Sequence, residues 1–215
     1  MTAGPGFVLY GSPGSGSAAV QAALHLAGAA YRIERASSWE ADSAQDALAR
    51  ANPLRQIPTL LTPDGGVMTE SAAILIHLGL SYPRSPLLPA DDAARARSIR
   101  GLVYIAANCY AAISIIDYPE RWSTDTSPAA LDALRQGTRK RLHRNWEIFA
   151  DSFGASPFLA GRVPGALDVL AAVVSKWSGT RAHLAEHRPA FSALLGRIES
   201  HPSVAPVFQA HWPSA

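Results

Sequence analysis

The amino-acid sequence predicts a small mixed α/β domain followed by an all-helical domain. Residues 1–83 alternate short β-forming runs with helical patterns, whereas strand signals largely vanish after Pro83. A proline-rich connector over residues 84–90 joins the two parts. We therefore expect an α/β domain over residues 1–83 and an all-α domain over residues 91–215.

Apolar periodicity and turn residues predict the individual elements. In the first domain we expect strands over residues 7–10, 31–33, 57–61 and 67–68, and helices over residues 18–27, 43–50 and 70–77. Gly28 is placed to end the first helix. In the second domain we expect helices over residues 91–116, 129–153 and 190–200, and another that starts near residue 166.

Composition excludes several classes of protein. Of the 215 residues, 48% are hydrophobic and 17% are charged, which is typical of a folded chain and not of a disordered one. The net charge of +2 favours neither nucleic acid nor an anionic membrane as a partner. Because no apolar run reaches ~18 residues without a charge or a turn, and no secretory signal is visible, we expect a cytoplasmic protein without a membrane span. The single cysteine, Cys109, excludes a disulfide framework, and we expect no metal site.

The segment from Asn52 to Leu60, which reads NPLRQIPTL, is the most informative motif. Pro58 cannot donate a hydrogen bond to a strand, so it belongs at a sheet edge or at a binding site. The Ile57–Pro58 bond is a candidate cis peptide. A cis bond would turn the backbone of Ile57 outward, where its N–H and C=O groups could pair with a peptide ligand.

Two polar segments stand where helices begin. Glu70 could receive an ammonium group and Ser71 a carboxylate, which together would recognise the zwitterionic end of an amino acid. A plain helix-capping arrangement around Thr69 or Ser71 explains the same residues equally well. The loop from Ser12 to Ser17 carries three hydroxyls that could stabilise a bound thiolate, although a Gly/Ser loop with a capping serine is the simpler reading.

Taken together, these segments resemble the glutathione transferase superfamily. The resemblance rests on VLYGSP from Val8, VQAALHLAG from Val20, NPLRQIPTL from Asn52 and MTESAAIL from Met68. In the helical part, Gly165-Ala-Leu-Asp168 is similar to the buried helix-capping box of the family, with glycine at the cap in place of the usual serine or threonine.

The resemblance implies a thioredoxin-like N-terminal domain, an all-α C-terminal domain, glutathione as cosubstrate and a homodimer. It implies that Ile57 and Pro58 bind the cysteinyl backbone of glutathione and that Glu70 and Ser71 bind its γ-glutamyl end. Gln56 and the neighbouring Arg55 would reach the glycyl carboxylate.

The thiol-activating group departs from the better-known classes of the family. Gly16 stands where cysteine-type members carry their cysteine, which argues against thiol-exchange chemistry. Gly14 stands where many serine-type members carry serine. We rank Ser15 first as the activating hydroxyl, followed by Ser12 and Ser17.

In this family the second substrate lies over the first long helix of the C-terminal part. Here that region carries Tyr104, Asn108 and Tyr118, which are the predicted lining of a substrate pocket, although interdomain or dimer packing explains them equally well. The resulting hypothesis is a detoxification-type glutathione transferase that directs the glutathione thiol at a small hydrophobic electrophile. The alternatives are a glutathione-dependent isomerase or dehalogenase, and a non-catalytic module on the same scaffold.

Overall fold

The computed structural model describes residues 6–213, and a four-stranded mixed sheet forms the centre of its N-terminal part. The strands are β1 (Phe7–Gly11), β2 (Tyr31–Arg35), β3 (Thr59–Leu61) and β4 (Val67–Met68), in the order β2-β1-β3-β4. β1 is parallel to β2 and antiparallel to β3, and β3 is antiparallel to β4. This is the mixed sheet that the alternation of the sequence predicts.

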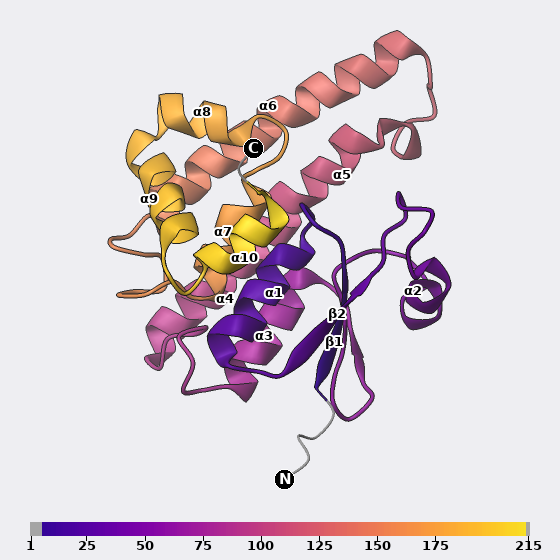
Figure 1. Cartoon of the computed structure of the whole chain (residues 1–215). Helices are drawn as coiled ribbons and strands as arrows, with labels where there is room; N and C mark the ends of the chain where they lie inside the picture. The colour runs from indigo at the N-terminus through magenta and orange to yellow at the C-terminus, as the bar shows by residue number, and fades with distance from the viewer. Residues whose placement is uncertain (1–5, 214–215) are drawn as a thin grey trace.

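Helices cover both faces of this sheet (Figure 1). The helices α1 (Ser17–Ala27) and α3 (Ser71–Ser81) pack on one face, where Leu9 of β1 joins the main core. The short helix α2 (Gln45–Ala51) lies on the other face, where Tyr10 contacts Leu48 in a separate small cluster. Successive residues of a strand point to opposite faces, so β1 serves both layers.

Two predicted element ends can be compared directly with the structure. Gly28 ends α1 in the left-handed conformation with φ of 65°, as the sequence predicts. The third strand was expected to begin at Ile57, but β3 begins at Thr59. Pro58 has no N–H to donate, so the ladder between β1 and β3 starts after it.

Apart from loops and one isolated β-bridge between Phe158 and Gly161, the described C-terminal part consists of helices. The sequence predicts α4 to α5, α6, α7 and α9, but it did not single out α8 or α10. Their bounds are α4 (Asp92–Tyr104), η1 (Ile105–Tyr110), α5 (Ala111–Asp117), η2 (Pro119–Arg121), α6 (Pro128–Phe153), α7 (Ala166–Val174), α8 (Thr180–His187), α9 (Pro189–Ser200) and α10 (Ala205–His211).

The elements α4, η1 and α5 form one continuous helix that crosses the molecule diagonally in Figure 1. Its middle section, η1, is a π-helix, in which the N–H of Ala111 reaches the carbonyl of Ala106. By length and composition alone, the helix Asp92–Asp117 would suffice to cross a membrane, a test that the core helix of a soluble protein also passes. Leu102, Ile105 and Cys109 of this helix are fully buried in the main core.

Helix α7 is the centre of the core, because all of its residues are buried. It contacts α1 and α3 of the N-terminal part as well as α4 and α9 of the helical part. The main hydrophobic cluster is therefore shared between the two parts of the chain.

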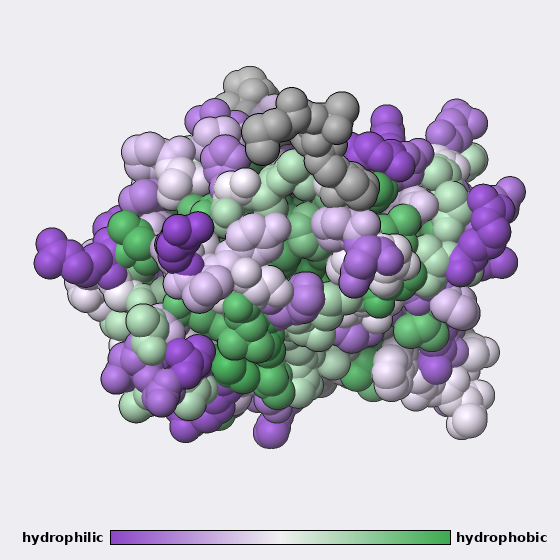
Figure 2. Space-filling model, turned by 90° about the horizontal axis from the view of Figure 1, so that it is seen from below, coloured by the Kyte–Doolittle hydropathy of each residue, from purple (hydrophilic) through white to green (hydrophobic). Residues whose placement is uncertain are grey.

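The underside of the molecule, seen in Figure 2, is a mixture of hydrophilic and hydrophobic patches rather than one continuous apolar face.

The start of α7 is held by a buried carboxylate. Asp168 accepts hydrogen bonds from the backbone N–H groups of Leu159 at 2.7 Å, Ala160 at 2.9 Å and Gly165 at 3.0 Å. The bond back to the cap residue, which the sequence predicts, is therefore confirmed. A Cβ atom at Gly165 would lie 2.6 Å from the carbonyl oxygen of Pro86, so the connector leaves no room for the usual capping side chain.

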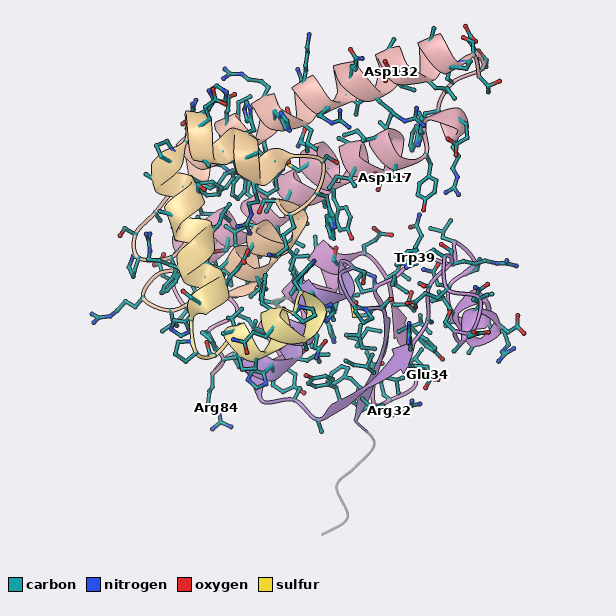
Figure 3. The ribbon with its side chains drawn as sticks, turned by 45° about the horizontal axis from the view of Figure 1, so that its top comes forward. Arg32, Glu34, Trp39, Arg84, Asp117 and Asp132 are labelled. Atoms are coloured by element: carbon teal, nitrogen blue, oxygen red, sulfur yellow. The ribbon has the colours of Figure 1, made fainter. Side chains whose placement is uncertain are left out.

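Replacing Asp168 with alanine should destabilise the protein strongly. The variant leaves three backbone N–H donors without their acceptor, and each buried unsatisfied group costs about 1–3 kcal/mol. We expect the free energy of unfolding, measured by urea denaturation at pH 7, to fall by at least about 3 kcal/mol. The control is Asp132→Ala on the exposed side of α6 (Figure 3), which should cost less than about 0.5 kcal/mol. Equal losses for the two variants would contradict the role of Asp168.

The single thiol should be unreactive in the folded protein. Cys109 is fully buried within η1, and this burial raises the pKa of its thiol well above the usual range. We expect iodoacetamide to alkylate the folded chain more than about a hundredfold more slowly than the chain unfolded in urea. A cysteine placed at the exposed Ser81 (Ser81→Cys) is the control and should react rapidly in the folded state. Rapid labelling of Cys109 in the folded wild type would show that η1 opens.

Candidate functional site

Three of the predicted segments lie at the ends of neighbouring elements. Tyr10 of β1 pairs with Thr59 of β3, so the loop that follows β1 lies beside the residues that precede β3. The third segment, Glu70 and Ser71, precedes α3, which packs beside α1 on the same face of the sheet. The charge of Glu70 acts on the phenol of Tyr110, and that phenol lies against Gly16 at the start of α1. The starts of α1 and α3 therefore open on a common region.

The hydroxyls of the loop before α1 form a closed hydrogen-bonded cluster. The Oγ atom of Ser15 donates to the carbonyl oxygen of Ser12 at 2.7 Å, and the Oγ of Ser17 lies 3.2 Å from the same carbonyl. The Oγ atoms of Ser15 and Ser17 are 2.8 Å apart. All three serines are buried. Ser15 and Ser17 thus stabilise the loop, and the assignment of Ser15 as the thiol-activating group stays a prediction.

A carboxylate that the sequence did not single out lies in the loop after β2, and the Ser12 hydroxyl acts on its pKa. Glu40, in the loop after β2, forms an ion pair with Arg35 at 2.8 Å and accepts a hydrogen bond from the hydroxyl of Ser37 at 3.0 Å. The hydrogen bond from Arg35 contributes most to a pKa of about 2 for Glu40, and the hydroxyls of Ser12 and Ser37 contribute less. Glu40 is therefore ionised at neutral pH, and its carboxylate is held by Arg35 and the hydroxyl of Ser37. The ion pair joins the last residue of β2 to a loop residue five positions later, and no short sequence pattern marks it.

The segment before β3 presents a free stretch of backbone. The Ile57–Pro58 peptide bond is cis, and within residues 6–213 neither the N–H nor the C=O group of Ile57 is hydrogen-bonded. The buried Asn52 braces this segment from behind, because its Nδ2 atom donates to the carbonyl oxygen of Gln56 at 3.1 Å. The side chains of Gln56 and Arg55 are exposed. The backbone of Ile57 thus remains free for another molecule.

Glu70 and Ser71 meet at the N-terminus of α3. Glu70 adopts φ of 64°, a left-handed conformation that non-glycine residues rarely adopt and that is often found at ligand sites. Its side chain is exposed. Ser71 is buried, and its hydroxyl makes no hydrogen bond to any described residue. The positive end of the helix dipole adds to this site, so an anion beside Ser71 and a cation beside Glu70 are both favoured.

A phenol from the helical part fills the space where Gly16 lacks a side chain. A Cβ atom at position 16 would lie 1.9 Å from the hydroxyl oxygen of Tyr110. The Tyr110 ring is stacked on Trp177 with 5.7 Å between ring centroids. Burial raises the pKa of Tyr110 to about 12, and the carboxylate of Glu70 adds to this effect. Sequence analysis missed Tyr110, and the only local sign of it is a glycine at position 16.

The three residues of the predicted substrate pocket are separated in the structure. Asn108 lines a hollow of about 510 Å³ between the η1–α5 segment and α6. Tyr104 instead points into the helical core, where its hydroxyl donates to the carbonyl oxygen of Asn145 at 3.0 Å. Tyr118 lies at the exposed end of α5, with the guanidinium of Arg121 4.0 Å from its ring centroid. Neither Tyr104 nor Tyr118 lines the hollow beside Asn108.

Two tryptophan side chains are exposed to solvent. Trp39, in the loop after β2, is 59% exposed, and Trp122, which follows α5 and η2, is 58% exposed. Figure 3 shows Trp39 and Asp117, at the end of α5, on the same side of the molecule.

Among residues 6–213, no three His, Cys, Asp or Glu side chains are grouped as a metal site would require.

Comparisons with known proteins agree with this architecture. The model of the family described as "Glutathione S-transferase, N-terminal domain" matches residues 17–80. The uncharacterized GST-like protein YncG of Escherichia coli (strain K12) is 30% identical over 205 residues, which are 94% of this chain and 96% of that protein.

Two solved structures share the fold. A glutathione transferase homologue from Sulfitobacter, solved with bound glutathione, has a TM-score of 0.82 and 22% identity, covering 94% of this chain and 96% of that one. BphK, a bacterial GST solved as a ternary complex, has a TM-score of 0.78 and 25% identity, covering 95% of this chain and 98% of that one. With its thioredoxin-like sheet, its helical part and a relative that is 30% identical over nearly the whole chain, this protein belongs to the glutathione S-transferase family.

Proposed function

We propose that this protein is a glutathione transferase that activates the glutathione thiol for attack on a small hydrophobic electrophile. The observation that carries the proposal is the free backbone of Ile57, which lies beside the loop at the start of α1. Its N–H and C=O groups can pair with the backbone of the cysteinyl residue of glutathione in a short antiparallel bridge. The glycyl carboxylate then lies toward Gln56 and Arg55.

The γ-glutamyl end of glutathione matches the charges at the start of α3. Its ammonium group pairs with the carboxylate of Glu70. Its carboxylate accepts hydrogen bonds from the free hydroxyl of Ser71 and from the free N–H groups of the first turn. Because the Ser71 hydroxyl has no hydrogen-bond partner among the described residues, it is available to the carboxylate of the ligand.

The cysteinyl sulfur then lies at the N-terminus of α1. Lowering the pKa of a bound thiol by about two units requires ~2.7 kcal/mol of preferential stabilisation of the thiolate. A helix N-terminus typically supplies about 0.3–1 kcal/mol. The remainder needs a hydrogen-bond donor, and the hydroxyls of Ser15 and Ser17 already bond to each other and to Ser12.

The second substrate is expected to be apolar. The exposed side chains of Trp39 and Trp122 offer apolar surface to a hydrophobic electrophile. Conjugation, isomerisation and dehalogenation all begin with the same attack by the thiolate, and the electrophile decides which of these reactions follows.

The domain bounds 1–83 and 91–215, the homodimer and the cytoplasmic location stay predictions.

Glutathione should bind to the wild-type protein, and Ser71→Ala should weaken the binding. A hydrogen bond to a charged group contributes about 1.5–3 kcal/mol, so we expect the Kd from isothermal titration calorimetry to rise about tenfold to hundredfold. Ser81→Ala, at the exposed C-terminal end of the same helix, is the matched control and should leave the Kd unchanged. An absence of binding to the wild type at millimolar glutathione would instead favour a non-catalytic module.

Ser15→Ala separates a structural from a catalytic role for the loop serines. Because the Ser15 hydroxyl bonds within the loop, its removal should lower the free energy of unfolding by about 1 kcal/mol, as the loss of a helix cap does. The pKa of the bound glutathione thiol, read from the ultraviolet absorption of the thiolate, should change by less than about half a unit. A rise of one unit or more would identify Ser15 as the activating hydroxyl, which is the ranking that the sequence suggests.

A further inference from the structure

We propose that Tyr110 is a catalytic residue whose hydroxyl donates a hydrogen bond to the thiolate of bound glutathione. This inference rests on the proposed function and names the donor that the loop serines do not supply. On binding, the thiol proton leaves to water, and Tyr110 keeps its own proton. The residue comes from the helical part of the chain, whereas the rest of the site comes from the N-terminal part.

The position of the hydroxyl is the main argument. Its oxygen would lie 1.9 Å from a Cβ atom at Gly16, so it occupies the place that a side chain at position 16 would take. Position 16 directly precedes α1, at the positive end of the helix dipole, where a thiolate is favoured. The glycine and the tyrosine are therefore complementary, because any side chain at position 16 would displace the phenol.

The hydroxyl of Tyr110 is available to a ligand. Within the described part of the chain it takes part in no hydrogen bond, in contrast to the phenol of Tyr104, which bonds to the carbonyl oxygen of Asn145. The ring itself is held in place by stacking on Trp177, with an angle of 28° between the ring planes. The phenol is thus oriented by packing and keeps its donor free.

The π-helix η1 ends at Tyr110. A π-helical turn contains more residues than an α-helical one, so it changes the direction in which the following side chains point. Single π-helical turns within α-helices are frequently found at functional sites. The irregular turn therefore coincides with the residue whose hydroxyl reaches the start of α1.

Burial, supported by the charge of Glu70, keeps the Tyr110 phenol in the protonated form that donates a hydrogen bond. Burial raises the pKa of Tyr110 to about 12, and the Glu70 carboxylate is the charged group that acts on it. The hydroxyl is therefore protonated at neutral pH and serves as a donor, not as a base. A hydrogen bond to an ionised partner lowers the pKa of that partner by about one to two units.

The test is Tyr110→Phe, which keeps the stacking ring and removes only the hydroxyl. We expect the pKa of the bound glutathione thiol, followed by ultraviolet absorption against pH, to rise by about one to two units. At a pH below the thiol pKa of both the wild type and the variant, the fraction of bound glutathione present as thiolate should be about tenfold to hundredfold lower in Tyr110→Phe than in the wild type. Tyr82→Phe, which removes a phenol hydroxyl near the other end of α3, is the matched control and should leave the thiol pKa unchanged.

S-methylglutathione separates this inference from the proposed function. The compound has no thiol proton, so calorimetry should give the same Kd for wild type and Tyr110→Phe. An unchanged thiol pKa in Tyr110→Phe, with S-methylglutathione still bound, would overturn the inference and leave the proposed function intact. A wild type that binds neither glutathione nor S-methylglutathione would overturn the proposed function, and the inference with it.

A second variant tests the same contact from the other side. Gly16→Ala places a methyl group against the Tyr110 hydroxyl and should displace it, which raises the thiol pKa as Tyr110→Phe does. Because both changes act through one hydroxyl, their effects on the thiol pKa should not add in the double variant. Full additivity would show that Gly16 and Tyr110 act independently, and this result would contradict the proposed contact.

Discussion

The contact between the Tyr110 hydroxyl and the backbone of Gly16 is the constraint on which the site depends. It brings a side chain from the helical part to the start of α1 in the N-terminal part. A side chain at position 16 and a phenol at position 110 cannot occupy the same space. The glycine at position 16 therefore leaves room for the phenol, whose pKa is raised by burial to about 12.

The buried helix α7 maintains this contact over the distance between the two parts of the chain. It packs against α1 on one side and α4 on the other, so the start of α1 and the segment η1 are held by a common core. The three N–H bonds to Asp168 and the bond from Ala166 to the carbonyl oxygen of Leu87 connect the start of α7 to the connector. Stability and function are therefore linked, because a shift of α7 would move Tyr110 relative to Gly16.

The binding groups for the two substrates of the proposed reaction are preorganised to different degrees. On the glutathione side, the backbone of Ile57 and the hydroxyl of Ser71 are unpaired and stand in fixed positions before binding. Such preorganised groups lose little conformational entropy when a ligand binds. On the other side, the exposed aromatic residues Trp39 and Trp122 belong to loops and turns, which favour apolar contact over one rigid pocket shape. The fold thus specifies the thiol more closely than the electrophile.

The amino-acid sequence by itself determined the α/β and all-helical parts, most helix and strand positions, the end of α1 at Gly28 and the role of Asp168. These features follow from local periodicity, from turn residues and from hydrogen bonds across a few positions. Only the tertiary structure decided that Ser15 bonds within its own loop, that Tyr104 points into the core and that Tyr110 reaches Gly16. For Tyr104 and Tyr110 the physical reason is that their contacts depend on the packing of segments far apart in the chain, where no local pattern records which side chains meet. For Ser15 the choice among the hydroxyls and carbonyls of one short loop depends on the backbone conformation that the loop adopts in the fold.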